Sequence, residues 1–232
     1  MAQNTSMAVM QQRIEPHDSL EDFPTPPWAT RALMEFLLSR YGREVGARLF
    51  ASMVCREPCA NRGFMARPLG EYFGTVEAAD ICDYGAGFEV RDYLFGPLPD
   101  LVDWTITNPP FRLAEQFIQR ALASSRIGCA MLVRTSFLET VGRYENLFSE
   151  QPPAVVLQFA GRVVMQKGKM LNPDVAVPVY SEKLEREIMR KPSTATSYCW
   201  LIWIHGSDGT AFAWVPPLRK KLEQPGDYGG AA

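Results

Sequence analysis

Asp103-Trp104-Thr105-Ile106-Thr107-Asn108-Pro109-Pro110-Phe111 is the stretch of the chain that decides the fold. Its first half reads as a buried strand, and two consecutive prolines follow. Neither proline has an N–H to donate to a sheet ladder, so the strand must end at Asn108. The rigid turn that follows brings the Asn108 amide, the Pro109 carbonyl and the Phe111 ring into one small volume.

These three groups suit one kind of chemistry. An amide oxygen and a carbonyl can each accept one N–H of an exocyclic amine, while an aromatic ring stacks on the base that carries the amine. The lone pair of such an amine is conjugated into the base, and two acceptors on its protons return electron density to nitrogen. The arrangement therefore favours methyl transfer to an aromatic amino group. The alternative is a strand-ending turn whose polar residue caps the next helix.

The tetrapeptide Asn108-Pro109-Pro110-Phe111 resembles the catalytic motif of amino-group methyltransferases that use S-adenosylmethionine, above all the adenine-N6 DNA methyltransferases. Residues 22–30, 134–138 and 193–203 are similar to phage- and prophage-type enzymes of this kind, so the resemblance covers most of the chain. It implies methyl transfer from S-adenosylmethionine to the N6 amine of an adenine flipped out of DNA, because that amine is unreachable inside a duplex. It also implies that the four motif residues are catalytic.

Composition limits the other possibilities. The chain has 232 residues, of which 47% are hydrophobic, enough for one large α/β domain. No apolar run approaches a membrane span and no signal peptide is recognisable, so we expect no membrane association. The five cysteines form no Cys-x-x-Cys pair, which favours reduced thiols in a cytoplasmic protein over a metal site. The net charge of −2 weighs only lightly against a DNA partner.

Strand and helix patterns alternate along the chain, which predicts an α/β fold with a doubly wound, mostly parallel sheet. The resemblance implies that this is the Rossmann-like methyltransferase fold. Strands are expected at 76–81, 104–107, 129–133, 155–159 and 198–204, and helices at 28–41, 113–124 and 138–148. Residues 211–215 are expected to form a hairpin with the strand before them. We assign 1–22 to a flexible arm, 23–215 to the methyltransferase domain and 216–232 to a C-terminal tail.

Residues 161–197 interrupt the alternation with a polar stretch that shows only a short helical pattern, near 181–189. This stretch contains seven basic and four acidic residues, a composition that is also typical of a solvated loop or helix face. A stretch this long without structure is usually a functional or a disordered loop. We predict a mobile insertion that engages DNA, with Lys167 and Lys169 as contacts, and we add Arg112 beside the motif.

The segment Glu57-Pro58-Cys59-Ala60-Asn61-Arg62-Gly63 resembles the glycine-rich loop of methyltransferases, in which an acidic residue opens the turn and small residues let the backbone approach the cofactor. Asn61 stands where the family has its first glycine. Asn is the non-glycine residue that best tolerates positive φ, so the turn can survive. The resemblance implies cofactor contacts from Glu57, Pro58, Cys59, Asn61 and Gly63.

Further cofactor residues follow from the order of the segments. Asp80 ends the next strand, where a carboxylate can accept hydrogen bonds from both ribose hydroxyls, although a loop acid is the alternative. The resemblance implies that Ile81 packs on the adenine of the cofactor and that Asp92 lies near its amino group. It also implies that the segment containing Thr25, Pro26 and Trp28 lines the methionine end.

Two other functions remain open. The same chemistry would serve an RNA base methyltransferase or one that modifies a glutamine amide of a protein. A degenerate, non-catalytic protein of this fold is the second alternative, and Asn61 is the residue that supports it. The sequence defines neither the recognition sequence nor the oligomeric state.

Overall fold

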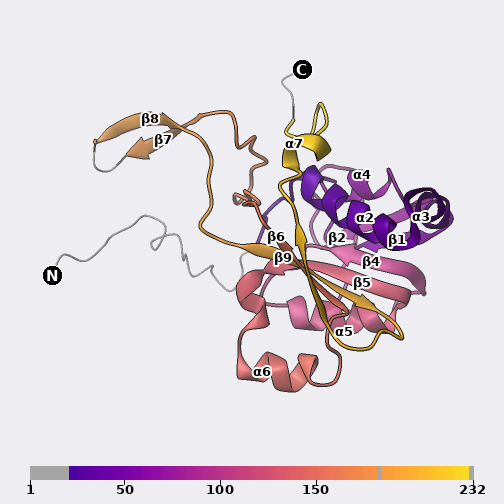
Figure 1. Ribbon diagram of the computed structural model, residues 1–232. Helices are drawn as coiled ribbons and strands as arrows, with labels where there is room; N and C mark the ends of the chain where they lie inside the picture. Colours follow the sequence, from indigo (N-terminus) through magenta and orange to yellow (C-terminus); the bar gives the residue numbers. More distant parts are fainter. Residues whose placement is uncertain (1–20, 182–183, 230–232) are drawn as a thin grey trace.

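The computed structural model describes residues 21–181 and 184–229, and its centre is an eight-stranded sheet in the order β10-β6-β9-β5-β4-β1-β2-β3 (Figure 1). The strands are β1 (Val54–Glu57), β2 (Thr75–Asp80), β3 (Glu89–Val90), β4 (Val102–Thr107), β5 (Ser125–Arg134), β6 (Val155–Phe159), β9 (Tyr198–Ile204) and β10 (Ala211–Val215). In this sheet β9 runs antiparallel to β5 and β6, and the remaining pairings are parallel. The predicted mostly parallel sheet is confirmed.

The central strands are buried on both faces, because helices cover both sides of the sheet. Side chains alternate between the faces, so Trp104, Leu132 and Trp200 enter one core and Met131 and Leu201 enter the other. The first core is covered by α2 (Pro27–Tyr41), α3 (Arg43–Phe50) and α4 (Ala66–Leu69). The second is covered by α5 (Ala114–Ala123) and by the segment that contains α6 (Val141–Arg143), as Figure 1 shows. Helices on both faces complete the doubly wound architecture.

The helix expected over 138–148 begins later, at Val141, and changes from α-helical to π-helical winding at Tyr144. A 3₁₀ turn, η1 (Thr135–Leu138), precedes α6, and a π-helical turn, η2 (Tyr144–Phe148), follows it. Thr140, whose φ of 103° is incompatible with a helix, separates η1 from α6. None of the helices in the described part of the chain is long and apolar enough to span a bilayer.

The prediction that 211–215 would form a hairpin with the preceding strand is wrong. β10 pairs in parallel with β6, in the register Ala211 opposite Val155. The reason is that β9 already pairs with β5 on one edge and β6 on the other, so it has no free edge to offer. β10 therefore crosses to the outer edge of β6 and extends the sheet.

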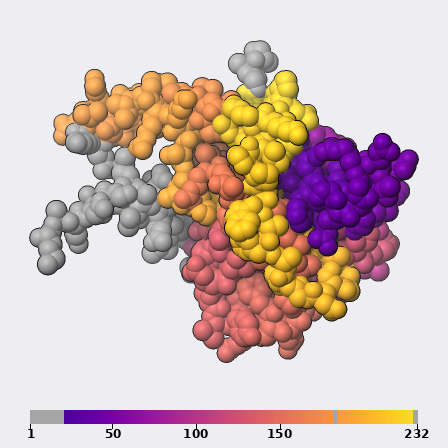
Figure 2. All heavy atoms as spheres, in the orientation of Figure 1, coloured from indigo at the N-terminus to yellow at the C-terminus, as the bar shows by residue number. Residues whose placement is uncertain are grey.

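The helical pattern near 181–189 is also not realised. β7 (Val177–Ser181) and β8 (Arg186–Arg190) form a two-stranded antiparallel hairpin instead. A helical segment this short has no packing partner to stabilise it, whereas the strand before it supplies a ladder of backbone hydrogen bonds. The hairpin, drawn in orange, extends from the body of the molecule (Figure 2). Residues 161–197 thus contain regular structure, while their mobility stays a prediction.

The chain after β10 is tied to the domain by a buried arginine on α2. Arg31 is 5% exposed and donates to both carboxylate oxygens of Asp227, at 2.8 and 3.0 Å, and to the carbonyl of Leu222 at 2.9 Å. It also holds Glu71 in a bidentate pair at 2.7 and 2.8 Å. Leu222 ends α7 (Arg219–Leu222), which packs against α2. The Arg31 guanidinium therefore joins three segments of the chain: α2, the segment that contains Glu71, and the chain after β10.

Replacing Arg31 with methionine should lower the free energy of unfolding by about 3–5 kcal/mol, because the Asp227 carboxylate would stay buried without a cation. Urea unfolding followed by circular dichroism measures the change. The control is Arg43→Met, which removes a guanidinium that is 72% exposed and paired with Glu35, and which should cost less than about 1 kcal/mol. Equal effects of the two substitutions would contradict the anchoring role of Arg31.

Candidate functional site

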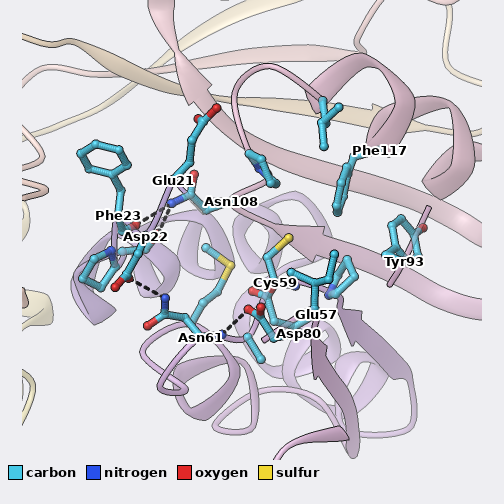
Figure 3. A pocket seen from close by; sticks show the side chains of 18 of the residues that line it. Glu21, Asp22, Phe23, Glu57, Cys59, Asn61, Asp80, Tyr93, Asn108 and Phe117 are labelled. Atoms are coloured by element: carbon cyan, nitrogen blue, oxygen red, sulfur yellow. Dashed lines mark hydrogen bonds between the residues drawn. The ribbon is translucent and has the colours of Figure 1, made fainter. Parts of the chain in front are cut away.

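A cavity of about 530 Å³ opens at the carboxyl ends of β1, β2 and β4. Ligands of parallel α/β sheets bind at this edge, and the volume suits a small-molecule cofactor. Figure 3 shows side chains from these three strand ends converging with an N-terminal segment, residues 21–25, which we call the strap. The predicted residues that line the cavity are Thr25, Glu57, Pro58, Cys59, Asn61, Asp80, Ile81, Asp92, Asn108, Pro110 and Arg112.

The Asn108 side chain is held in one orientation by the strap. Its Nδ2 donates to the Phe23 carbonyl and to the Thr25 hydroxyl oxygen, both at 3.0 Å (Figure 3). The Thr25 hydroxyl in turn donates to the Met165 sulfur at 3.9 Å. Because both protons of the amide point to protein acceptors, Oδ1 is the atom left over. It is buried, and no described residue donates a hydrogen bond to it.

The turn after Asn108 has the shape that the prolines impose. The Pro110 carbonyl accepts the Leu113 N–H at 2.9 Å, which leads the chain into α5. The Phe111 ring does not line the cavity. The Arg134 guanidinium lies over that ring, 4.4 Å from its centroid, and Phe23 and Tyr198 lie against it with centroids 6.1 Å away. Stacking of a base on the face under Arg134 therefore requires Arg134 to move.

The loop after β1 adopts the tight turn that the sequence predicts. Asn61 has φ of 51° and Gly63 has φ of 85°, so the positive φ expected at Asn61 is confirmed. At Gly63 a side chain is disfavoured, because the φ of 85° strains any other residue and a Cβ would lie 3.0 Å from the Phe88 ring. Asn61 uses its amide inside the protein: Nδ2 donates to Asp22 at 2.6 Å and Oδ1 accepts the Arg62 N–H at 2.8 Å. Asn61 thus joins the loop to the strap.

Glu57 is fully buried at the end of β1 and lines the cavity. Its Oε1 accepts the Cys59 N–H at 2.9 Å and the Thr107 hydroxyl, while Oε2 has no partner among the described residues. Burial raises the pKa of Glu57 to about 8, although these two hydrogen bonds oppose the shift. A cation placed against Oε2 would favour the ionised carboxylate. Burial likewise raises the pKa of the Cys59 thiol, so Cys59 is not poised as a nucleophile.

Asp80 stands at the end of β2 with both oxygens turned to the loops. Oδ2 accepts the Asn61 N–H at 2.8 Å and Oδ1 accepts the Cys82 N–H at 3.1 Å. Asp80 therefore does cap the loops, as the alternative interpretation holds, but each carboxylate oxygen keeps a lone pair for a ligand. Burial raises its pKa. Next to it, Ile81 lines the cavity although it is 56% exposed, which suits an apolar contact with a flat ring.

Several predicted residues lie away from the cavity wall. Trp28 is buried in the core, edge-on to Phe159, and Pro26 precedes α2 and accepts the Ala29 N–H through its carbonyl. Their assigned cofactor contacts stay predictions, as does that of Gly63, whose role here is conformational. Asp92 accepts the Leu94 N–H at 2.9 Å and does line the cavity.

The basic residues predicted to contact DNA fall in two places. Arg112 follows the motif and lines the cavity. Lys167 and Lys169 are exposed on a turn whose Gly168 N–H donates to the Asp22 carbonyl at 2.8 Å, so this turn lies against the strap. In residues 21–181 and 184–229 no three histidine, cysteine or acidic side chains gather as a metal site would require.

Thr25 is the one residue of the strap that the sequence analysis assigned to the site. Glu21 and Asp22 were assigned to the arm, yet both line the cavity and both contact other segments. The aromatic residues Tyr84, Tyr93 and Phe117 in the cavity wall were also missed. No local pattern distinguishes these residues, because their role depends on which segments the fold brings beside them.

The chain matches no protein-family model and no curated protein. Solved structures with the same fold include a candidate class I S-adenosylmethionine-dependent methyltransferase from Listeria monocytogenes, with a TM-score of 0.54 and 12% identity over 89% of this chain and 68% of that one. A modification subunit of a candidate type I restriction enzyme from Vibrio vulnificus YJ016 aligns with a TM-score of 0.52 and 14% identity, over 90% of this chain and 50% of that subunit. The fold is therefore that of the class I methyltransferases.

Glu57→Gln should make stability less dependent on pH. The folded protein raises the pKa of Glu57 from 4.5 to about 8, so the stability that the neutral acid contributes is complete below about pH 4.5 and is lost as the pH rises through 8. Glutamine mimics the neutral acid at every pH. Urea unfolding at pH 5, 7 and 9 measures the free energy of unfolding of both proteins. The value for the variant, relative to that of the parent, should increase as the pH rises. A difference that stays constant with pH would contradict the assigned pKa.

Proposed function

We propose that this chain is an S-adenosylmethionine-dependent methyltransferase that acts on the N6 amine of a flipped adenine in DNA. The observation that carries the proposal is the orientation of the Asn108 amide. Its N–H groups are bound by the strap, and its buried Oδ1 is left without a donor among the described residues. A buried acceptor without a partner is costly unless a ligand supplies the donor. The N–H of an amine is such a donor.

The cofactor assignment is supported by the fold and by the groups in the cavity. S-Adenosylmethionine carries an ammonium and a sulfonium, and the buried Oε2 of Glu57 is a carboxylate oxygen that no described residue pairs with. Asp80 and Ile81 at the end of β2 offer an acceptor for ribose hydroxyls and an apolar surface for adenine. When bound, the cofactor supplies an electrophilic methyl group. The two structural neighbours described above are named for this chemistry or for a modification reaction.

The residues of the chain then act on the amine. Asn108 Oδ1 and the Pro109 carbonyl would each accept one N–H, which returns electron density to the nitrogen that attacks. The Pro109 carbonyl accepts no backbone hydrogen bond from a described residue, but Pro109, unlike Asn108 and Pro110, does not line the cavity, so its role as second acceptor rests on the motif. Positioning supplies much of the remaining acceleration, because the two reactants become effectively one molecule.

DNA is favoured as the substrate by the motif, by the similarity of its flanking segments to phage-type enzymes, and by the exposed lysines on the 166–169 turn. Phe111 is the proposed stacking surface for the base. A stacked base returns about 1–3 kcal/mol, comparable with the few kcal/mol that flipping costs. In this proposal Arg134 swings off the Phe111 ring when the base enters.

The direct test is transfer of a labelled methyl group from S-adenosylmethionine to duplex DNA of random sequence, single-stranded DNA, RNA and protein in parallel reactions. We expect label in DNA, recovered after digestion as N6-methyladenine. Label confined to RNA or to a glutamine side chain would replace DNA by one of the alternative substrates. Cofactor binding without transfer to any acceptor would favour the non-catalytic alternative.

Asn108→Ala should reduce kcat by about 10²–10³-fold, the loss typical of one oriented group at a reacting centre. The cofactor Kd should stay within about threefold, because Asn108 is assigned to the amine. Thr25→Val removes the acceptor that orients the Asn108 amide and should lower kcat by about tenfold, while Thr25→Ser should restore it. Single-turnover kinetics and isothermal titration measure the two quantities. An equal loss of cofactor affinity in Asn108→Ala would overturn the role of Asn108.

Lys167→Ala combined with Lys169→Ala should weaken DNA binding irrespective of sequence and flatten its dependence on salt. Removing one phosphate contact changes the slope of log K against log salt by about 0.9. Fluorescence anisotropy with a duplex, in a series of salt concentrations around the physiological value, measures this slope. Lys221→Ala, an exposed change on α7, is the control and should leave the slope unchanged. A normal slope in the double variant would remove the 166–169 turn from the DNA interface.

A further inference from the structure

The strap places a carboxylate on the turn that carries the catalytic motif. Glu21 Oε2 accepts the backbone N–H of Phe111 at 2.8 Å, and Oε1 lies 3.8 Å from Nε of Arg112. The Glu21 side chain is only 7% exposed. A carboxylate is thus seated between a backbone N–H and a guanidinium, three residues beyond Asn108.

Proteins commonly bind a nucleic-acid phosphate with a backbone N–H group and an arginine side chain. Such contacts fix the position of the backbone and leave base recognition to other groups. The nucleotide of a base presented to Asn108 has a phosphate on either side of its sugar, and this turn, three residues beyond Asn108, is within reach of one of them. Charge and hydrogen-bonding capacity make a carboxylate oxygen the protein group that most resembles a phosphate oxygen.

The two acidic residues of the strap are held in different ways. Asp22 accepts hydrogen bonds from Asn61 at 2.6 Å and from Arg62 at 2.9 and 3.1 Å, which anchors the strap to the loop after β1. The separation of Glu21 from Arg112 exceeds hydrogen-bonding distance, and Arg112 is 37% exposed. Glu21 also has φ of 45°, in the left-handed region that is strained for a non-glycine residue. Glu21 is therefore the more strained of the two acidic residues.

We propose that the Phe111 N–H and Arg112 form a binding site for a backbone phosphate of the nucleic-acid substrate, and that Glu21 occupies this site until the substrate replaces it. The inference rests on the proposed function in that the substrate is a nucleic acid. Exchange of one anion for another conserves the hydrogen bond to Phe111. It also removes the repulsion that a buried carboxylate would exert on an incoming phosphate.

The consequence is that Glu21 competes with nucleic acid. Glu21→Gln keeps a carbonyl that can accept the Phe111 N–H, so the strap stays in place, but it removes the negative charge that lies beside Arg112. One additional phosphate contact is worth about fivefold in affinity at physiological salt and adds about 0.9 to the magnitude of the salt slope. Arg112→Ala should abolish that gain.

The experiment measures binding of a short fluorescent duplex and of an abasic single strand to the full chain in the presence of S-adenosylhomocysteine, across a salt series. The proteins are the parent, Glu21→Gln, Glu21→Ala, Arg112→Ala and the double variant Glu21→Gln with Arg112→Ala. The control is Glu35→Gln on α2, which removes a carboxylate that is paired with Arg43 and changes the net charge by the same amount. Thermal unfolding of each variant reports its folding.

We expect Glu21→Gln and Glu21→Ala to bind about fivefold more tightly with a steeper salt slope, and Glu35→Gln to match the parent within about twofold. The gain should vanish in the double variant. A gain that survives the removal of Arg112, or that Glu35→Gln reproduces, would be a general charge effect and would overturn the phosphate site. A fall in affinity for S-adenosylhomocysteine in Glu21→Gln would make Glu21 a cofactor ligand and overturn it too.

Failure of the inference is distinguishable from failure of the proposed function. If the parent methylates DNA but the Glu21 variants bind like the parent, only the phosphate site is wrong. If the parent binds and methylates no nucleic acid, both are wrong. Glu21→Ala controls for any contact that the new amide of Glu21→Gln makes itself. The inference therefore requires both variants to show the same gain in affinity for nucleic acid.

Discussion

The end of β4 is the constraint on which the site depends. Pro109 and Pro110 cannot donate to a ladder, so β4 stops between β1 and β5, at the edge of the sheet where the parallel strands end together. The residue at that stop faces the space between strand ends rather than a pairing partner. Asn108 occupies it, and the cavity, the loop after β1 and the strap are arranged around its amide.

The strap converts this position into an oriented group. A free amide can rotate by half a turn and offer either end to a ligand, and at such a site the two ends have opposite chemistry. The Phe23 carbonyl and the Thr25 hydroxyl, both from a segment far away in sequence, remove that ambiguity. The strap also contacts the Asn61 loop and the 166–169 turn, so it connects the loop after β1 with the turn that carries Lys167 and Lys169.

The electrostatics of the cavity favour a cationic ligand. Burial raises the pKa of Glu57 and of Asp80, and the charge of Asp80 further opposes ionisation of Glu57. Such an arrangement costs stability in the free protein and is offset when a positive group enters. On the strap, by contrast, the carboxylate of Asp22 is already paired with Arg62. The part of the cavity formed by Glu57 and Asp80 thus suits a cationic cofactor, while the basic residues near the strap suit a polyanion.

Much of the fold and part of the site could be predicted from the sequence, because they depend on local rules. Short, mostly apolar runs predict β4, β5 and β9, consecutive prolines specify where β4 ends, and the residue types at 57–63 favour a turn with positive φ at Asn61. Tertiary structure decided the rest. The partner of β10 depended on which strand edges were free, the β7–β8 hairpin on a ladder that a local helical pattern does not reveal, and the orientation of Asn108 on contacts with the strap. Strand periodicity and turn geometry act over a few residues, whereas edge pairing, amide orientation and the seating of Glu21 on Phe111 require segments far apart in sequence to meet.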